Sequence, residues 1–176
     1  HQQKGVQLQE DAKRALPRIS PVLQVEVVLY IHRQWLGSIW FIRDLEAAVK
    51  VRLAMSMEPK VLAPGEVAPT RMLYVVQRGK VMFNGRILSR GMVWGDDIIL
   101  QDSRYCLPCL ARAIVYTDLT QLSQAKLSEI VSTYPASRTS LRRSTVRLAF
   151  RRHIVVKARE KSARLLKESQ ELGKDQ

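Results

Sequence analysis

Apolar and polar positions divide this chain into helical ends and a centre of short strands. Over residues 22–36 apolar residues recur at helical spacing and cover more than one face of the expected helix. Ser20 followed by Pro21 is typical of a helix start, with a serine cap and a proline at the first helical position. A Gly-Ser pair at 37–38 ends this helix, and the apolar segment 39–42 follows. A helix that is apolar on two sides predicts packing against two surfaces or a second subunit.

A second helix is expected over residues 43–57, where apolar residues recur at every fourth position along one stripe. Pro59 closes it. Residues 1–15 are polar and lack strong periodicity, and the Leu-Pro pair at 16–17 ends this lead-in.

The central part of the chain is predicted to form strands separated by tight turns. Asn84 and Gly85, flanked by apolar runs, are typical of a two-residue hairpin. Many short strands between glycine turns indicate an antiparallel roll or barrel. The expected strands are residues 61–62, 72–77, 80–83, 86–88, 92–94, 111–116 and 120–122.

The chain is predicted to return to helix at its C-terminal end. Ser123 caps an expected helix over 124–134, Pro135 interrupts it, and a long helix follows over 136–171. The predicted fold class is therefore α+β: an antiparallel, jelly-roll-like β-roll of about eight short strands, flanked by N-terminal helices and by a C-terminal hinge helix plus a long helix.

The stretch 91–100, Gly-Met-Val-Trp-Gly-Asp-Asp-Ile-Ile-Leu, carries the strongest indication of chemistry. An apolar strand runs into Gly95, and Asp96 and Asp97 then open a short apolar segment that includes Ile98. Backbone N–H groups and a carboxylate can surround one small polar ligand in such a turn. Either the two carboxylates contact a ligand or they cap the short helix.

This stretch, followed by Ala-Arg-Ala at 111–113, resembles the phosphate-binding cassette of cyclic-nucleotide-binding domains, whose usual form is Phe-Gly-Glu, three apolar residues, a loop and Arg-Thr-Ala. Residues 91–113 are called the cassette below. Further resemblances are the Ala-Pro-Gly-Glu turn within 62–66 and a hinge helix that ends in Tyr-Pro at 134–135. Over about residues 16–152 the chain is similar to the cytoplasmic domains of ether-à-go-go-type and cyclic-nucleotide-gated-type potassium channels.

The resemblance implies three parts: residues 1–42 as the end of a channel linker, 43–152 as the cyclic-nucleotide-binding-like domain, and 153–176 as a basic helical extension. It implies a regulatory domain on the cytoplasmic side of a membrane, within a homotetrameric voltage-gated cation channel or a related ion transporter. The expected partners are the rest of that membrane protein and its other subunits. The alternative is a degenerate binding fold that serves as a scaffold in a soluble cytoplasmic assembly.

The cassette departs from the family pattern where the ligand would bind. Asp96 stands in place of the ribose-binding glutamate, on a stem one methylene shorter, and Leu107 stands in place of the phosphate-binding arginine. Losing that guanidinium costs about 1.5–3 kcal/mol, or roughly ten- to a hundredfold in affinity. Arg104 could supply a cation in a different loop register, although Pro108 limits the freedom of the loop. The candidate ligand-binding residues are Gly95, Asp96, Asp97, Ile98, Arg104, Leu107, Pro108 and Cys109.

These departures predict weak or absent binding of cAMP and cGMP, and no resident cofactor. Ether-à-go-go-type domains fill a similarly altered pocket with a short strand of their own, and the matching residues here are 148–151. Phe150 is the candidate self-ligand, although Arg151 and Arg152 differ from the small polar and apolar pair of the family.

The formal net charge is +13, and it is concentrated near the C-terminus. Residues 138–167 hold eleven Lys or Arg residues and a single acid, Glu160. This is either a solvated face or a surface for anionic lipid or an acidic protein. Nucleic acid is not an expected partner, because no second turn-linked helix is predicted after the long helix. The residues that define this basic face are Arg138, Arg142, Arg143, Arg147 and Arg151.

An enzyme is not expected. The three histidines are scattered, no nucleophile has a base at motif spacing, and no phosphate-loop glycine pattern is present. Cys106 and Cys109 are expected to be reduced, because a structural zinc ion would need two more ligands. The longest apolar stretch, 22–42, contains acidic and basic residues and is not expected to span a bilayer.

Overall fold

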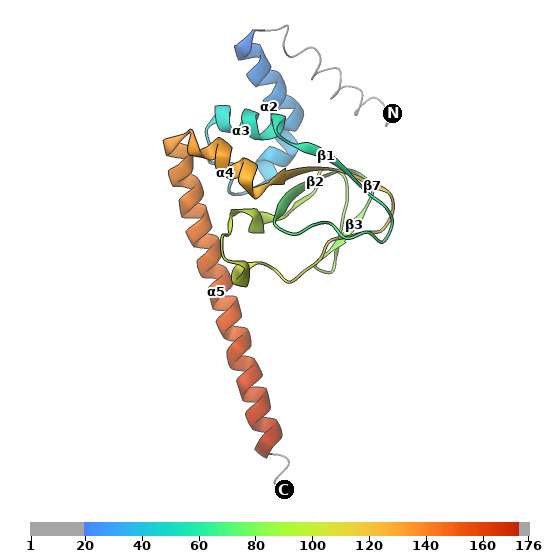
Figure 1. The fold of residues 1–176 in the computed structure, drawn as a ribbon, viewed down its shortest axis with the longest axis vertical. Coiled ribbons are helices and arrows are strands. Elements are labelled where there is room, and N and C mark those ends of the chain that lie inside the picture. Colours follow the sequence, from blue (N-terminus) through green and yellow to red (C-terminus); the bar gives the residue numbers. More distant parts are fainter. Residues whose placement is uncertain (1–19, 173–176) are drawn as a thin grey trace.

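The computed structural model describes residues 20–172, with side chains up to residue 165, so the predicted lead-in at 1–17 lies outside the described residues. Two N-terminal helices precede a β-roll, and a short and a long helix follow it (Figure 1). The helices are α2 (Pro21–Ser38), α3 (Ala47–Met55), α4 (Gln124–Ser132) and α5 (Pro135–Leu172). The strands are β1 (Glu58–Leu62), β2 (Met72–Arg78), β3 (Val81–Phe83), β4 (Arg86–Leu88), β5 (Val93–Trp94), β6 (Arg112–Ala113) and β7 (Thr117–Ser123).

The start of α2 is as predicted, whereas α3 begins later than expected. The Ser20 hydroxyl accepts a hydrogen bond from the Leu23 N–H at 3.4 Å. Residues 39–45 form consecutive turns, so residues 43–46 of the helix expected over 43–57 are not helical. The Ile42 N–H donates to the Ile39 carbonyl at 3.0 Å. Ile39, Ile42 and Leu45 are all buried in this segment. The turns direct more apolar side chains into the core than one face of a helix would, and they displace the first helical turn.

The strands form two antiparallel sheets, one in the order β1-β7-β2-β5 and one in the order β4-β3-β6. Seven strands form within residues 20–172, against about eight expected, and the α+β roll is confirmed. The hairpin at Asn84 and Gly85 is also confirmed, with φ of 50° and 73°. The strand expected over 111–116 pairs only at Arg112–Ala113, because residues 114–116 are exposed in the turn that leads to β7.

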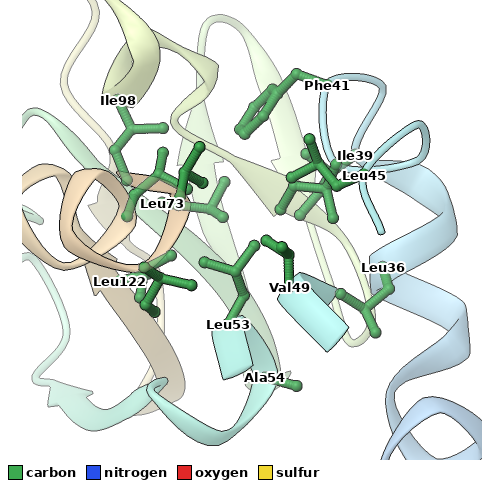
Figure 2. Close-up of a cluster of buried hydrophobic side chains, with 14 of the residues drawn as sticks. Leu36, Ile39, Phe41, Leu45, Val49, Leu53, Ala54, Leu73, Ile98 and Leu122 are labelled. Atoms are coloured by element: carbon green, nitrogen blue, oxygen red, sulfur yellow. The ribbon is translucent and has the colours of Figure 1, made fainter. Parts of the chain in front are cut away.

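Two apolar clusters lie on opposite faces of β2. Leu73 and Val75 belong to the cluster that contains α2, α3, α4 and the turns at 39–45 (Figure 2). Tyr74 and Val76 point into the second cluster, inside the roll. The N-terminal helical segment therefore shares one core with the sheet.

Helix α5 begins directly after α4 and extends well past the roll (Figure 1). Leu148, 3% exposed, belongs to the cluster that joins the helices to the sheet, whereas the described residues from 157 to 165 are exposed. No helix within residues 20–172 is long and apolar enough to cross a membrane.

Candidate functional site

Gly95 turns the chain from β5 into η2, a 3₁₀ segment at Asp96–Ile99 that opens the cassette. Its φ is +99°, and an added Cβ would lie 2.0 Å from the backbone oxygen of Met72, so only glycine fits. The preceding Trp94 ring stacks on Tyr74 at a centroid separation of 4.7 Å. Ile98 is fully buried and fixes η2 against the core.

Asp97 joins three separate parts of the chain. Its Oδ2 accepts a hydrogen bond from the Leu107 N–H at 2.6 Å, across the cassette loop. Its Oδ1 lies 3.3 Å from a guanidinium nitrogen of Arg152, on α5. The same nitrogen lies 3.6 Å from Oδ1 of Asp96. The cassette carboxylates therefore hold the loop and α5 to η2.

A cavity of about 290 Å³ lies beside Asp97. Gly95, Leu107, Pro108 and Cys109 line it, as the sequence predicts for a ligand site. Its other lining residues, apart from Asp97, are Ala68, Pro69, Thr70, Arg71, Met72, Phe83, Trp94, Ser103, Cys106 and Ala111.

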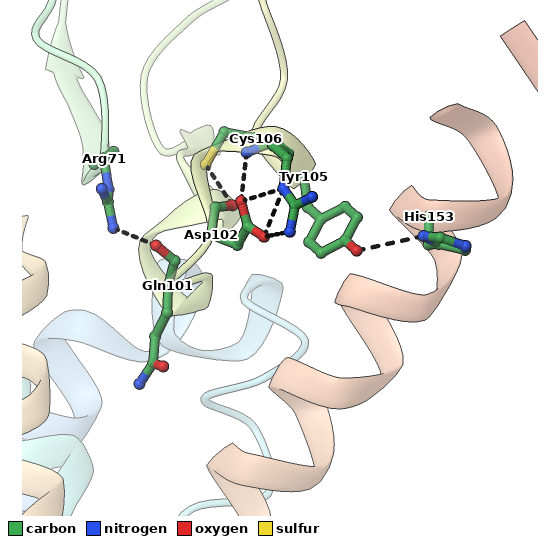
Figure 3. Close-up of polar contacts among 7 residues, drawn as sticks. Arg71, Gln101, Asp102, Tyr105, Cys106 and His153 are labelled. Carbon is green, nitrogen blue, oxygen red and sulfur yellow. Dashed lines mark hydrogen bonds and ion pairs between the residues drawn. The ribbon is translucent and has the colours of Figure 1, made fainter. Parts of the chain in front are cut away.

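Arg71, which sequence reasoning missed, is the one cation that lines this cavity among the described residues. A single nitrogen of its guanidinium donates to the carbonyl oxygen of Gln101 at 3.1 Å (Figure 3). The same nitrogen donates to the carbonyl oxygen of Leu100 at 3.3 Å and to Oε1 of Gln124 at 2.9 Å. These bonds fasten the end of η2 to the start of α4. No motif marks Arg71 in the sequence, because its partners lie far along the chain.

Three predicted site residues lie away from this cavity. Arg104 is 78% exposed and pairs with Asp102 at 2.7 Å on the surface of the cassette loop. The hydrogen bond from the Arg104 side chain also holds the pKa of Asp102 below its usual value. Ile98 lies beneath the cavity in the core, and Asp96 lines a neighbouring cavity instead.

Phe150, the candidate self-ligand, is 67% exposed and lines neither cavity. Residues 148–151 continue the α5 helix and form no strand. Residues four apart share a helix face, so Leu148 and Arg152 face the roll while Phe150 points away. Arg152 therefore contacts the cassette in the region where the sequence suggested an aromatic ring.

The neighbouring cavity, of about 450 Å³, separates the 38–41 segment from the roll. Phe83, Trp94 and Gly95 form a wall between the two cavities. The other residues that line this larger cavity are Ser38, Ile39, Trp40, Phe41, Leu73, Asn84, Arg86, Leu88, Val93 and Asp96.

The two thiols of the cassette are free and point in different directions. Cys106 donates to the backbone oxygen of Asp102 (Figure 3), and Cys109 donates to Oδ1 of Asn84 at 3.4 Å. Burial raises the pKa of Cys106. Both thiols are therefore hydrogen-bond donors within the loop and its neighbouring hairpin.

Burial raises the pKa of Asp96, and the negative charge of Asp97 raises it further despite the nearby Arg152. The folded state therefore favours the protonated carboxyl group of Asp96. The stability that this gives is lost as the pH rises through the folded-state pKa. Asp96→Asn has no such loss. We expect its melting temperature to exceed that of the parent at pH 7, with the gap closing toward pH 4. Thermal melts of both proteins between pH 4 and pH 7 test this prediction. A difference in melting temperature that does not change with pH would contradict it.

All five residues of the predicted basic face are exposed along α5. Apolar residues lie beside them on the same helix, with Val146 61%, Phe150 67% and Ile154 52% exposed. Within the described residues, the face carries no acidic counterpart before Glu160.

No protein-family model matches the chain. Among curated proteins it is 26% identical to the cyclic nucleotide-gated channel cone photoreceptor subunit alpha of Gallus gallus, over 74% of this chain and 20% of that protein. It is also 26% identical to the human cyclic nucleotide-gated channel alpha-3, over 74% of this chain and 21% of that protein. The chain spans about a fifth of the length of these relatives. The predicted resemblance to a cyclic-nucleotide-binding domain of channel type is confirmed, and the reported relatives are channels, not enzymes.

Proposed function

We propose that this chain is a cytoplasmic regulatory domain of a voltage-gated cation channel, and that it binds cyclic nucleotides weakly or not at all. Its homology to cyclic nucleotide-gated channels and its roll with a C-terminal helix support the first part. The environment of Leu107 supports the second. This residue lines the cassette cavity, and its N–H is already bonded to Asp97 at 2.6 Å.

A cyclic phosphate in this cavity would meet unfavourable electrostatics. The Asp97 side chain is only 14% exposed and lines the cavity, so its charge is weakly screened. The side chain of Leu107 offers neither a charge nor a hydrogen-bond donor. Arg71 could approach an anion only by giving up the hydrogen bonds that fasten η2.

The coupling between the roll and the channel would pass through the shared core. The turns at 39–45 pack with α3 against Leu73 and Val75 of β2. A displacement of the roll or of α5 would therefore move α2. Val22 and Tyr30, 72% and 68% exposed on α2, suit contact with a neighbouring subunit of a tetramer. In this proposal residues 1–42 belong to the linker, 43–152 to the binding-like domain and 153–176 to the extension.

Restoring a cation at position 107 tests the loss of nucleotide binding. We expect no resolvable heat when cAMP or cGMP is titrated into the parent below millimolar concentration. Leu107→Arg should bind about ten- to a hundredfold more tightly, because a guanidinium forks onto the phosphate. Isothermal titration calorimetry of both proteins tests this, with the variant giving a dissociation constant and the parent a lower limit on its own.

Leu110→Arg is the matched control, because Leu110 is 60% exposed and lies outside the cavity wall. It adds the same charge three residues further along. Equal gains in nucleotide affinity for the two variants would show that the added positive charge attracts the nucleotide wherever it lies, and that its position in the cassette does not matter. Micromolar binding by the parent would refute the proposed weak site.

The second candidate is a scaffold in a large assembly, and the α5 surface favours it. A basic face with exposed Phe150 and Ile154 suits an acidic protein or anionic lipid. Sedimentation of the 176-residue chain separates the two candidates. A tetramer supports the channel domain, and a monomer that joins a larger assembly supports the scaffold.

A further inference from the structure

Arg152 contacts the cassette directly through its guanidinium group. It lies on α5, 55 residues from Asp97, and its guanidinium is within 3.3 Å of that carboxylate and 3.6 Å of Asp96. Its side chain is 19% exposed, far less than that of an ordinary surface arginine. The neighbouring His153 lies 3.3 Å from the Tyr105 hydroxyl, in the second 3₁₀ segment of the cassette (Figure 3).

The burial of Arg152 distinguishes it from the rest of the basic run. Arg143, Arg147 and Arg151 are exposed, whereas Arg152 follows the buried Leu148 by one helical turn and faces the roll. Its Nε is buried and has no hydrogen-bond partner. A cation is kept out of water in this way only when nearby anions compensate for its lost hydration.

The charge of the cassette fits a guanidinium and opposes a phosphate. Asp96 and Asp97 are adjacent in sequence, and both face the same Arg152 nitrogen. The planar, delocalised guanidinium is more weakly hydrated than an ammonium and forms directional bonds to carboxylates. Lysine at this position would present a more strongly hydrated ammonium on a side chain one bond shorter.

We propose that the cassette of this chain is a guanidinium site and that its occupant is Arg152 of the same chain. The contact holds α5 against the cassette. The inference goes beyond the proposed channel role, because it concerns what the cassette binds and holds in the isolated chain.

Chemical rescue tests this site in the full chain. In Arg152→Ala, we expect the amides of α5 between residues 146 and 158 to exchange with deuterium about tenfold faster than in the parent. Ethylguanidinium at 10 mM should restore slow exchange by entering the vacated site, and ethylammonium at the same concentration should not. Hydrogen exchange with mass spectrometry measures all three conditions, and unchanged exchange in β2 confirms that the fold is intact.

Two further variants complete the experiment. Arg151→Ala removes an exposed neighbour of equal charge and should exchange like the parent. Arg152→Lys should exchange faster than the parent, because the lysine side chain is one bond shorter and its ammonium is more strongly hydrated than a guanidinium. The proposal is overturned if the α5 amides of Arg152→Ala exchange like those of the parent. It is also overturned if ethylguanidinium and ethylammonium restore slow exchange equally. Nucleotide titration of the parent is a separate measurement, so failure of the proposed weak binding is distinguishable from failure of this contact.

Discussion

Gly95→Ala is expected to lower the free energy of unfolding by about 3 kcal/mol or more. The added Cβ would lie 2.0 Å from the Met72 oxygen and 3.1 Å from the Leu73 Cα. These are backbone atoms, so no side-chain rotation relieves the clash, and β5 must separate from β2. The stacking of Trp94 on Tyr74 would be disturbed at the same time. Urea denaturation of both proteins measures the loss.

Gly65→Ala separates the clash from backbone strain. Gly65 has a similar φ of +82°, but nothing lies within 4 Å of its added Cβ. It should therefore lose only about 1–2 kcal/mol, the cost of left-handed backbone for a non-glycine residue. Equal losses in the two variants would show that the contact with Met72 is unimportant.

Asp97→Ala is expected to lower the free energy of unfolding by about 2–4 kcal/mol. The variant removes the acceptor of the Leu107 N–H and leaves Arg152 with only the more distant Asp96. A partly buried donor and a partly buried cation both lose a partner. Denaturation at neutral pH and low salt measures the effect.

The matched control is Glu129→Ala, which breaks an exposed ion pair with Lys126 on α4. Both side chains are solvated, so the change should stay below about 0.5 kcal/mol. If Asp97→Ala falls in the same range, the Asp97 contacts do not stabilise the fold.

Local chemistry made much of the fold predictable. The Ser20 and Ser123 caps and the Asn84–Gly85 hairpin depend on neighbouring residues, and all three form as expected. The late start of α3 was missed because residues 43–46 suit a helix and a series of turns equally well. Only packing against β2 decides between them.

The part of the candidate site that depends on local sequence was predictable as well. Counting along the cassette placed Leu107 in the cavity wall. The contacts of Asp97 and Arg152 connect residues that are distant in sequence, and a basic run does not show which arginine is buried. One signal was available, because Arg152 lies one turn after the apolar Leu148 and so shares its face.

The position of Trp94 makes the molecule its own optical probe. Its indole forms part of the wall common to both cavities and is 8% exposed. A molecule that enters either cavity changes the surroundings of this ring, and so its emission. With Trp35 and Trp40 replaced by phenylalanine, fluorescence from the one remaining indole would report occupancy without any attached dye.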